Sequence, residues 1–352
     1  MNFATLQGLT IPEGVVKQIT DASGRVLWAV RRGTMAVLQV EKITSDTYAG
    51  ETTYTGEQFI LLDIYPKTNG TVRVTYGGLT KTITDTSGAA EPNAQQVFFG
   101  TFNGVADSVT TPASGRLTIE GDCYSFDVGT FSKSDSFKNG IIRCDCVTAI
   151  SDCGNIKKFN YYAFSSCAKL TTIDIDGVVS IGNNAFYNCD ALKSVTIPTS
   201  VESIGEASFS DCGALEPIIV DSSNAYYSSD GVALFNKNKT KIIQYPQTAK
   251  ATAYTIPNGV TRIGSESFYN HPYITNYTIP ASVNEIGTTA FYHPIGLKRT
   301  FTFLGTTPPT LPSSWAFGSS LNTFVVPKGC GDAYRAAGYV RDGYDDYIVE
   351  AS

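Results

Sequence analysis

Two histidines, His271 and His293, are the side chains of this sequence best suited to bind a metal or to transfer protons. Each follows a phenylalanine by two or three residues in successive copies of a repeated phrase, so we expect the imidazoles to lie within several ångströms of each other. Such a pair could share a metal or titrate as a unit. The simpler interpretation is two partly buried polar side chains that fill a turn.

A catalytic triad would require one of these histidines to be exposed beside an acid. The nearest acids, Glu266 and Glu285, occupy turn positions that we expect to face solvent. The sequence has no P-loop, no H-E-x-x-H motif and no nucleophile elbow. No pair of carboxylates stands out as a glycosidase acid and base. We therefore predict no catalytic site and no cofactor.

The cysteines argue against a disulfide framework and against a metal centre. Of the eight, Cys167, Cys189 and Cys212 each stand three residues after a phenylalanine of the repeat, which predicts small side chains packed in the core. Three more follow the pattern C-x-C-x6-C within residues 144–153. A zinc site would need a fourth ligand and looser spacing, so we prefer reduced thiols here and predict no metal.

Histidines and cysteines alike belong to the phrase I-G-x-x-[AS]-F-x-x-[CH]-x-x-L-x-x-[VI]-x-[IV]-P. It starts at Ile181, Ile204, Ile263 and Ile286, at intervals of 23, 59 and 23 residues. A period in the twenties is typical of a solenoid, in which each unit forms one coil and buries its apolar side chains against its neighbours.

Besides the opening isoleucine, two positions of the phrase are the same in all four copies. One register is phenylalanine, which predicts an aromatic ladder in the core; its members are Phe164, Phe186, Phe209, Phe268 and Phe291. Another register is glycine, which predicts a turn that needs the backbone freedom of that residue. These glycines are Gly182, Gly205, Gly264 and Gly287.

The end of each phrase predicts a strand with a solvent-facing row of short side chains. In residues 192–198 apolar side chains alternate with Ser194 and Thr196, as the period of a strand requires, and a proline ends the strand. Solenoids bind ligands on extended surfaces of this kind. The candidate binding face consists of Thr172, Asp174, Ser194, Thr196, Pro217, Ile219, Asn276 and Thr278. The alternative is a row of solvated strand positions without a function.

The long interval contains an additional hairpin within residues 221–262. We expect its strands near Val232–Phe235 and Lys241–Tyr245, joined by a polar turn. It would bring Tyr226, Tyr227 and Tyr245 to one rim, where tyrosine can anchor a sugar ring or a peptide.

Residues 160–340 resemble the BspA-like leucine-rich repeats of cell-surface and phage-encoded proteins of gut and oral bacteria. The resemblance rests on the phrase above and on a C-terminal pattern TPPTL…VVPKGCGDAYRAAG. It implies a solenoid with a parallel sheet on one face, and adhesion or recognition rather than catalysis.

The predicted fold class is mainly β, in three parts. Residues 1–32 contain two alternating runs around a turn and predict an attachment hairpin. Residues 33–135 contain short β-branched and aromatic runs between turns, which predict an Ig-like β-sandwich. Residues 136–352 form the solenoid with its caps.

The composition limits the classes of partner that we expect this protein to bind. The net charge is −6 and only 16% of residues are charged, without a basic run, so we predict no nucleic acid partner. No apolar run reaches the length of about 18 residues that a membrane helix needs, so no membrane insertion is expected. The N-terminus lacks the pattern of a signal peptide, which favours a virion over an exported protein.

Three functions compete. The first is a phage tail or baseplate protein, because the segment IPEG-x-V-x-x-I-T-D-x-S-G-x-V-L-W resembles the N-termini of such proteins. In that case the N-terminal region would contact other virion proteins, and the solenoid would contact a bacterial surface glycan or protein. The second is a bacterial cell-surface adhesin. The third is a carbohydrate-active enzyme with its acids on loops. The sequence leaves a homo-oligomer open.

Overall fold

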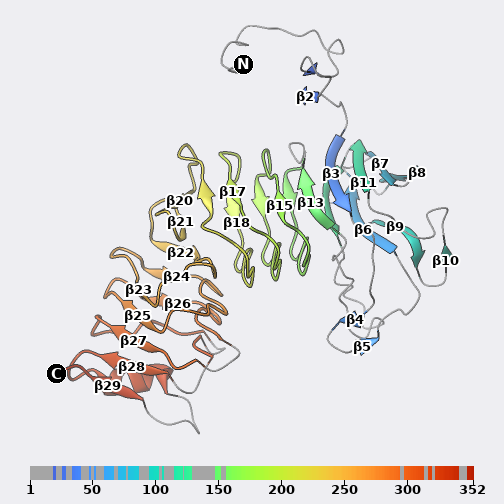
Figure 1. Cartoon of the computed structure of the whole chain (residues 1–352). Coiled ribbons are helices and arrows are strands. Elements are labelled where there is room, and N and C mark those ends of the chain that lie inside the picture. The colour runs from blue at the N-terminus through green and yellow to red at the C-terminus, as the bar shows by residue number, and fades with distance from the viewer. Residues whose placement is uncertain are drawn as a thin grey trace.

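The computed structural model (Figure 1) describes residues 156–293, 297–312, 316–318, 322–340 and 347–352, residues 70–76 and 78–86, and the other strands that precede residue 152. The predicted N-terminal hairpin is present: β1 (Ile19–Thr20) pairs antiparallel with β2 (Val26–Trp28). Its turn lies outside the described residues. The short strands β4 (Thr47–Tyr48) and β5 (Glu51–Thr52) form a second antiparallel pair.

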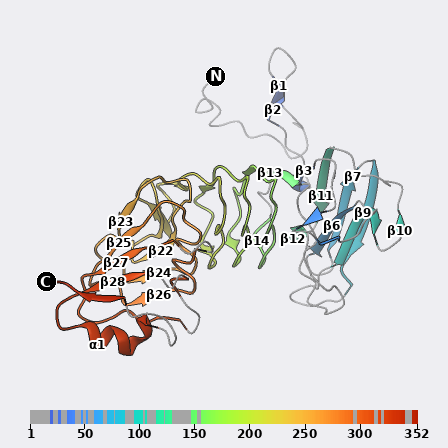
Figure 2. The same cartoon turned by 60° about the horizontal axis from the view of Figure 1, so that its bottom comes forward.

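The remaining strands of the N-terminal part form two sheets (Figure 2). The four-stranded sheet has the order β10 (Val105–Ala106), β9 (Gln95–Phe102), β6 (Phe59–Pro66) and β12 (Cys123–Val128). The six-stranded sheet has the order β15 (Thr172–Ile173), β13 (Val147–Ser151), β3 (Thr34–Val40), β11 (Gly115–Gly121), β7 (Thr71–Tyr76) and β8 (Leu79–Thr84). Most side chains of these strands lie outside the described part, so the Ig-like sandwich and the division at residue 135 stay predictions.

The strand β13 joins the N-terminal strands to the repeats. It pairs antiparallel with β3 on one side and parallel with β15, a strand of the repeats, on the other. A single hydrophobic cluster likewise includes Val74 and Leu117 before the repeats and Phe159 and Leu170 within them. The first coil therefore has no open edge at β13, because β3 covers it.

The repeats form a β-solenoid of about eight turns between residues 149 and 350. Strands on one face come from the end of each phrase: β15, β17 (Thr196–Ile197), β19 (Ile219–Val220), β23 (Ala253–Thr255), β25 (Asn276–Ile279), β27 (Thr300–Phe303), β28 (Thr323–Val326) and β29 (Ile348–Glu350). A second face consists of β14 (Lys158–Phe159), β16 (Ser180–Ile181), β18 (Ser203–Ile204), β24 (Arg262–Ile263) and β26 (Glu285–Ile286). The last four of these strands end in the isoleucine that opens a phrase, and β14 has Phe159 at that position.

The predicted aromatic ladder fills the space between the faces. Phe164 stacks on Phe186 with ring centroids 5.3 Å apart, and Phe186 stacks on Phe209 at 5.5 Å. Farther along, Phe268 stacks on Phe291 at 5.2 Å. All five rings are buried. The ladder is thus confirmed, and it supplies much of the apolar surface that neighbouring coils remove from water.

The glycine register has a different cause from the one we predicted. None of the four glycines has a positive φ, so backbone freedom is not the reason for them. A Cβ at any of these positions would lie 2.3–2.6 Å from an atom of the preceding coil. The reason is close approach: consecutive coils touch at Gly182, Gly205, Gly264 and Gly287, and no other residue type fits.

The predicted hairpin interrupts the solenoid. The strands β20 (Tyr227–Ser229), β21 (Leu234–Asn236) and β22 (Lys241–Gln244) pair antiparallel in sequence, and β22 then pairs parallel with β24. Figures 1 and 2 show that the solenoid changes direction here. The buried side chains also separate into two clusters at this point. We call this bend the elbow, the coils before it the first segment and the coils after it the second segment.

The elbow follows from a coil that is too short on one side. In the other phrases four residues lie between the isoleucine and the ladder phenylalanine, but only two lie between Ile242, the partner of Ile263, and Tyr245. Tyr245 nevertheless takes the ladder position, stacked on Phe268 at 5.1 Å. This coil has two residues fewer in its turn and a hairpin added on the opposite side. It is therefore a wedge, and the axis bends toward the turns.

The C-terminal end is closed by the predicted short helix. The helical turn α1 (Gly331–Tyr334) and the π-helical turn η2 (Arg335–Tyr339) follow β28. Tyr334 and Tyr339 are buried and donate their hydroxyl hydrogens to the carbonyls of Gly305 and Pro309. Trp315, a predicted packing anchor, lies outside the described residues.

Candidate functional site

The candidate binding face points to solvent as predicted, but it is not one continuous surface. Seven of its eight residues are exposed, Ile219 by 60%, and Thr278 is half-buried. The side chains stand in register from coil to coil: Thr172 lies beside Ser194, and Thr196 beside Ile219. However, β19 and β23 belong to separate sheets, so the elbow divides the row.

We call the two parts the first and second strand faces. The first strand face consists of Thr172, Asp174, Ser194, Thr196, Pro217 and Ile219. The second strand face is richer in threonine than we predicted, since Thr300 and Thr302 of β27 pair with Asn276 and Thr278 of β25. It consists of Asn276, Thr278, Thr300 and Thr302.

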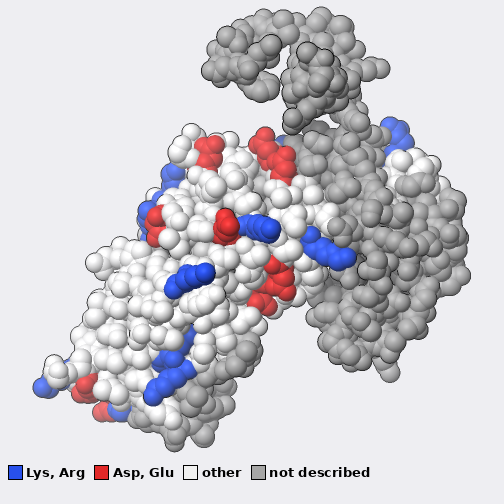
Figure 3. All heavy atoms as spheres, in the orientation of Figure 1, with Lys and Arg blue, Asp and Glu red and all other residues white. Residues whose placement is uncertain are grey.

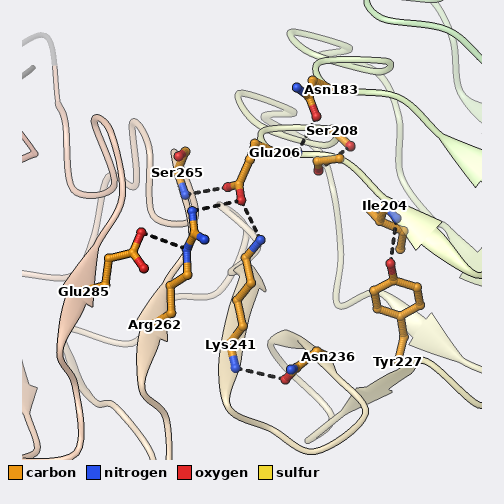
Figure 4. Close-up of polar contacts among 11 residues, drawn as sticks. Asn183, Ile204, Glu206, Ser208, Tyr227, Asn236, Lys241, Arg262, Ser265 and Glu285 are labelled. Carbon is orange, nitrogen blue, oxygen red and sulfur yellow. Dashed lines mark hydrogen bonds and ion pairs between the residues drawn. The ribbon is translucent and has the colours of Figure 1, made fainter. Parts of the chain in front are cut away.

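The predicted tyrosine rim does not form. Tyr226 is 46% exposed, but Tyr227 and Tyr245 are buried. The Tyr227 hydroxyl accepts a hydrogen bond from the backbone N–H of Ile204 at 2.6 Å (Figure 4), and so occupies the place of the strand that would follow β18. Tyr245 belongs to the aromatic ladder. Both rings replace structural elements that the irregular coil lacks, and neither is available to a ligand.

A charge cluster that we did not predict holds the elbow together. Glu206, in the last turn of the first segment, forms an ion pair with Lys241 at 2.5 Å and another with Arg262 at 3.4 Å (Figure 4). Its Oε2 accepts a hydrogen bond from the N–H of Ser265 at 2.9 Å. Arg262 also pairs with Glu285 at 3.3 Å. We call these residues the elbow clamp.

The electrostatics of Glu206 agree with this geometry. Partial burial would raise its pKa, but the contacts with Lys241, Ser265 and Arg262 outweigh burial and lower the pKa. The carboxylate is therefore charged at neutral pH. A sequence signal for the clamp existed, because Lys241, Arg262 and Glu285 occupy one register of consecutive strands.

A second link crosses the elbow at the same turns. The Asp211 carboxylate accepts hydrogen bonds from the Asn270 side chain at 2.9 Å and from the Gln247 side chain at 3.2 Å. Residues 59 positions apart in sequence thus lie in contact, because the shortened coil between them has no turn of full length. The turns of the two segments meet on the inner side of the bend.

Tyrosines line these turns. The residue after the ladder phenylalanine is Tyr187, Tyr269 or Tyr292 in three of the coils. All three are half-buried. Tyr269 stacks on Tyr292 at 5.3 Å, and Tyr187 of the first segment lies 6.5 Å from Tyr269 of the second. The repeat pattern contained this row, but its continuity across the elbow depends on the bend.

The histidines do not form a metal site. His271 is fully buried, and its Nδ1 accepts hydrogen bonds from the N–H groups of Tyr273 and Ile274. The proton of the neutral ring is therefore on Nε2. Burial and the adjacent Arg299 guanidinium lower the pKa of His271 to about 4. Burial and Arg299 also lower the pKa of His293. The positive charge of Arg299 opposes a metal cation here.

The cysteines of the repeat have the predicted structural role. Cys167, Cys189 and Cys212 are buried and are not joined in disulfides. The Cys189 and Cys212 thiols donate to the carbonyls of Phe164 and Phe186, one coil earlier. The predicted C-x-C-x6-C thiols at Cys144, Cys146 and Cys153 lie outside the described residues. Where side chains are described, no group of three metal-ligating residues comes together.

The surface carries few charges. Figure 3 shows single Lys, Arg, Asp and Glu side chains scattered over the described part of this face, in both signs. None of the helices in the described residues could span a bilayer.

Comparisons with solved structures find other leucine-rich repeat proteins. A leucine rich cell surface protein of Faecalibacterium prausnitzii is 22% identical over 58% of this chain and 59% of its own, with a TM-score of 0.43. The pneumococcal vaccine antigen PcpA is 18% identical over 56% and 66%, with a TM-score of 0.40. A leucine-rich repeat protein from Eubacterium ventriosum is 20% identical over 59% and 72%, with a TM-score of 0.39.

This chain thus spans about three fifths of the Faecalibacterium chain. At these identities and TM-scores, the ligands of these proteins cannot be assigned to this chain. No curated protein matches the sequence.

The repeats themselves decide the family. The model of the BspA type leucine rich repeat region matches residues 133–251 and 244–332 in six copies, which is more than half of the chain. Its span includes both segments and the elbow between them. The chain is a member of the BspA type leucine-rich repeat family.

Proposed function

We propose that this protein is a non-enzymatic recognition protein of a bacterial cell surface, and that its solenoid binds a glycan or protein ligand. Support comes from the family, whose repeats typically bind rather than catalyse. The comparisons give no support to the virion role that the N-terminal hairpin suggested, so the cell-surface alternative is preferred. Among the described residues we could assign no acid–base pair of the kind that a carbohydrate-active enzyme needs.

One observation carries the proposal. The first strand face presents short, exposed side chains in register across consecutive coils, with no charged side chain except Asp174. Such a face loses little side-chain entropy on binding and offers hydroxyl groups that both donate and accept. Extended ligands bind solenoids on faces of this kind.

The test is a binding screen with the full chain against a printed glycan array and a panel of immobilised surface proteins. Thr196→Lys places a long charged side chain in the middle of the first strand face. We expect this variant to weaken binding at least about tenfold, as the loss of one group of contacts would. The matched control is Asn238→Lys, which adds the same charge to an exposed loop of the hairpin.

Binding that Thr196→Lys leaves unchanged would remove the first strand face from the site. A chain that binds nothing on either panel would overturn the proposed function.

A further inference from the structure

The inner side of the elbow has the properties of a ligand site that the strand faces lack. Burial raises the pKa of Tyr162, of the first segment, to about 12, with smaller contributions from Tyr161 and from Glu266 of the second segment. The bend brings groups of the two segments into contact: the Asp211 carboxylate accepts a hydrogen bond from the Asn270 side chain, 59 positions later in the sequence. A ligand here would contact both segments at once.

The aromatic part of this surface is the row of Tyr187, Tyr269 and Tyr292. The rings are half-buried, so their edges and hydroxyls reach solvent while their inner parts pack on the turns. Burial raises the pKa of Tyr187 and of Tyr269, and the nearby carboxylates add to this effect. The Tyr187 and Tyr269 phenols are therefore protonated at neutral pH. Tyrosine combines apolar area with a polar end and costs little entropy to hold.

The polar part of the surface lies between these rings. Ser210 occupies the register of the tyrosines in the last coil of the first segment, and it is fully buried. Its hydroxyl faces the Glu266 carboxylate. Ser210 Oγ and Glu266 Oε2 are both buried, and the hydroxyl partly offsets the effect of burial on the pKa of Glu266. A ligand on the surface cannot reach either buried atom, so this pair orients the Glu266 side chain beneath the tyrosines and is not itself a contact point.

The negative charge of this surface affects which classes of ligand it can bind. Glu266 and Asp211 lie close enough for each to affect the pKa of neighbouring groups, and burial followed by Asp211 raises the pKa of Glu266. The nearest cations in the described residues, Lys241 and Arg262, are bound to Glu206 and Glu285. The surface thus disfavours anions such as uronic acids or sulfated sugars.

We propose that the elbow site, formed by Tyr187, Tyr269, Tyr292, Ser210, Asp211 and Glu266, binds an uncharged polysaccharide. The ligand would lay the apolar faces of its rings along the exposed parts of the tyrosines and donate hydroxyl hydrogens to the carboxylates of Asp211 and Glu266, which are only half-buried. The tyrosines repeat along the solenoid, and a polysaccharide repeats its rings and hydroxyls in the same way. The inference deepens the proposed function, because it assumes that the solenoid binds a ligand and names a place and a chemical class.

The experiment measures binding of the full chain to three soluble probes: a neutral mannan, a neutral β-glucan and the acidic polymer hyaluronan. We expect at least one neutral polymer to bind and hyaluronan to bind at least tenfold more weakly. Tyr269→Ala removes the central ring and should weaken binding at least tenfold. Tyr226→Ala is the matched control, since Tyr226 is exposed on the hairpin; it should change binding less than twofold.

Two further variants keep the test decisive if Tyr269→Ala fails to fold. Glu266→Gln is isosteric and should weaken binding about tenfold through the loss of one charged acceptor. Tyr269→Phe keeps the ring and should lose less affinity than Tyr269→Ala. Equal binding of hyaluronan and the neutral polymers, or neutral-polymer binding that survives both Tyr269→Ala and Glu266→Gln, would overturn the elbow site.

The outcomes also separate the two proposals. Binding lost in Thr196→Lys but retained in Tyr269→Ala and Glu266→Gln keeps the proposed function and removes the elbow site. Competition of the neutral polymer by a lysine-rich peptide at lower concentration would reassign the elbow to basic peptides and overturn the saccharide proposal. If neither polysaccharides nor surface proteins bind, both proposals fall.

Discussion

His271 is a buried base that the fold keeps neutral. Its Nδ1 serves as the acceptor that ends the turn, and the N–H groups of Tyr273 and Ile274 donate to it. Arg299 lies beside it and donates to its backbone carbonyl at 2.6 Å. A protonated imidazole would lose both acceptor interactions and would face a fixed positive charge. The residue thus stabilises the fold only in its neutral form.

This predicts a loss of stability in mild acid. The pKa of His271 is about 4 in the folded chain and about 6.5 in the unfolded chain. Between these values the unfolded chain binds a proton that the folded chain does not, so stability is full above the higher pKa and falls as pH drops toward the lower one. By pH 5 the loss amounts to about 2 kcal/mol.

Urea unfolding at pH 7.5 and pH 5.0 checks this, with His271→Asn as the comparison. Asparagine offers an acceptor at the same place and does not titrate, so the variant should lose about 2 kcal/mol less than the parent between the two pH values. His293 is present in both proteins, and its contribution cancels. Equal losses would show that His271 does not control the acid response.

At this scale sequence reasoning was correct for residues whose role repeats from coil to coil. It placed Phe209 in the ladder and Cys189 in the core. It was wrong for Tyr227 and Tyr245, because their positions depend on how one irregular coil joins its neighbours. A repeat pattern predicts whether a side chain points inward or outward only as long as the spacing of the repeat is constant. The shortened turn removes two residues, so the pattern no longer predicts the positions of the residues in this coil.

At the scale of elements, the elbow clamp fixes one turn to two strands. Glu206 has an exposed side-chain fraction of 32%, so its ion pairs are partly screened by solvent. Its hydrogen bond to the Ser265 N–H adds a contact that a purely surface pair would lack. The clamp therefore contributes more than an ordinary surface ion pair and less than a buried one.

We expect Glu206→Gln to destabilise the chain by about 1–2 kcal/mol at pH 7. Glu285→Gln, which removes only one exposed partner of Arg262, should cost less than about 1 kcal/mol.

Because the folded-state pKa of Glu206 is lowered, its contribution is present above the unfolded pKa and is lost as pH falls through the folded value. Parent and Glu206→Gln should therefore converge in acid, as chemical unfolding would measure. An identical cost for the two variants at pH 7 would contradict a special role of Glu206.

The elements themselves were predictable to different degrees. The hairpin β21–β22 and the strands that end each phrase followed from alternation and proline. The elbow did not follow, since it results from a deletion in one turn, and neither the contact of Glu206 with Ser265 nor that of Asp211 with Asn270 has a local signal. Candidate sites that span the elbow could be found only once the bend was known.

At the scale of the whole molecule, the N-terminal strands are part of the support of the solenoid. The strand β3 covers the edge of β13, and the side chains of Val74 and Leu117 belong to the same hydrophobic cluster as the first coils. Removal of the strands before residue 136 would expose the edge and part of this cluster. Exposed strand edges promote association between chains.

The fragment 136–352 should accordingly unfold at a temperature at least about 5 °C below that of the full chain, the shift that a loss of one to two kcal/mol causes. It should also self-associate in size-exclusion chromatography with light scattering. A chain that lacks only residues 1–32 keeps β3 and serves as the control, which should match the full chain. Equal unfolding temperatures for 136–352 and the full chain would show that the first coil is closed without β3.

The close contacts at Gly182, Gly205, Gly264 and Gly287 bear on how such a protein changes over evolutionary time. A duplicated unit of 23 residues carries its own glycine and phenylalanine, so a new coil can be inserted between two old ones without altering either contact. Each insertion lengthens the molecule by about 4.8 Å, the spacing of paired strands, and leaves its direction unchanged. Duplication of the coil that contains Tyr245 would instead turn the axis once more. Length and curvature are therefore inherited separately in this repeat.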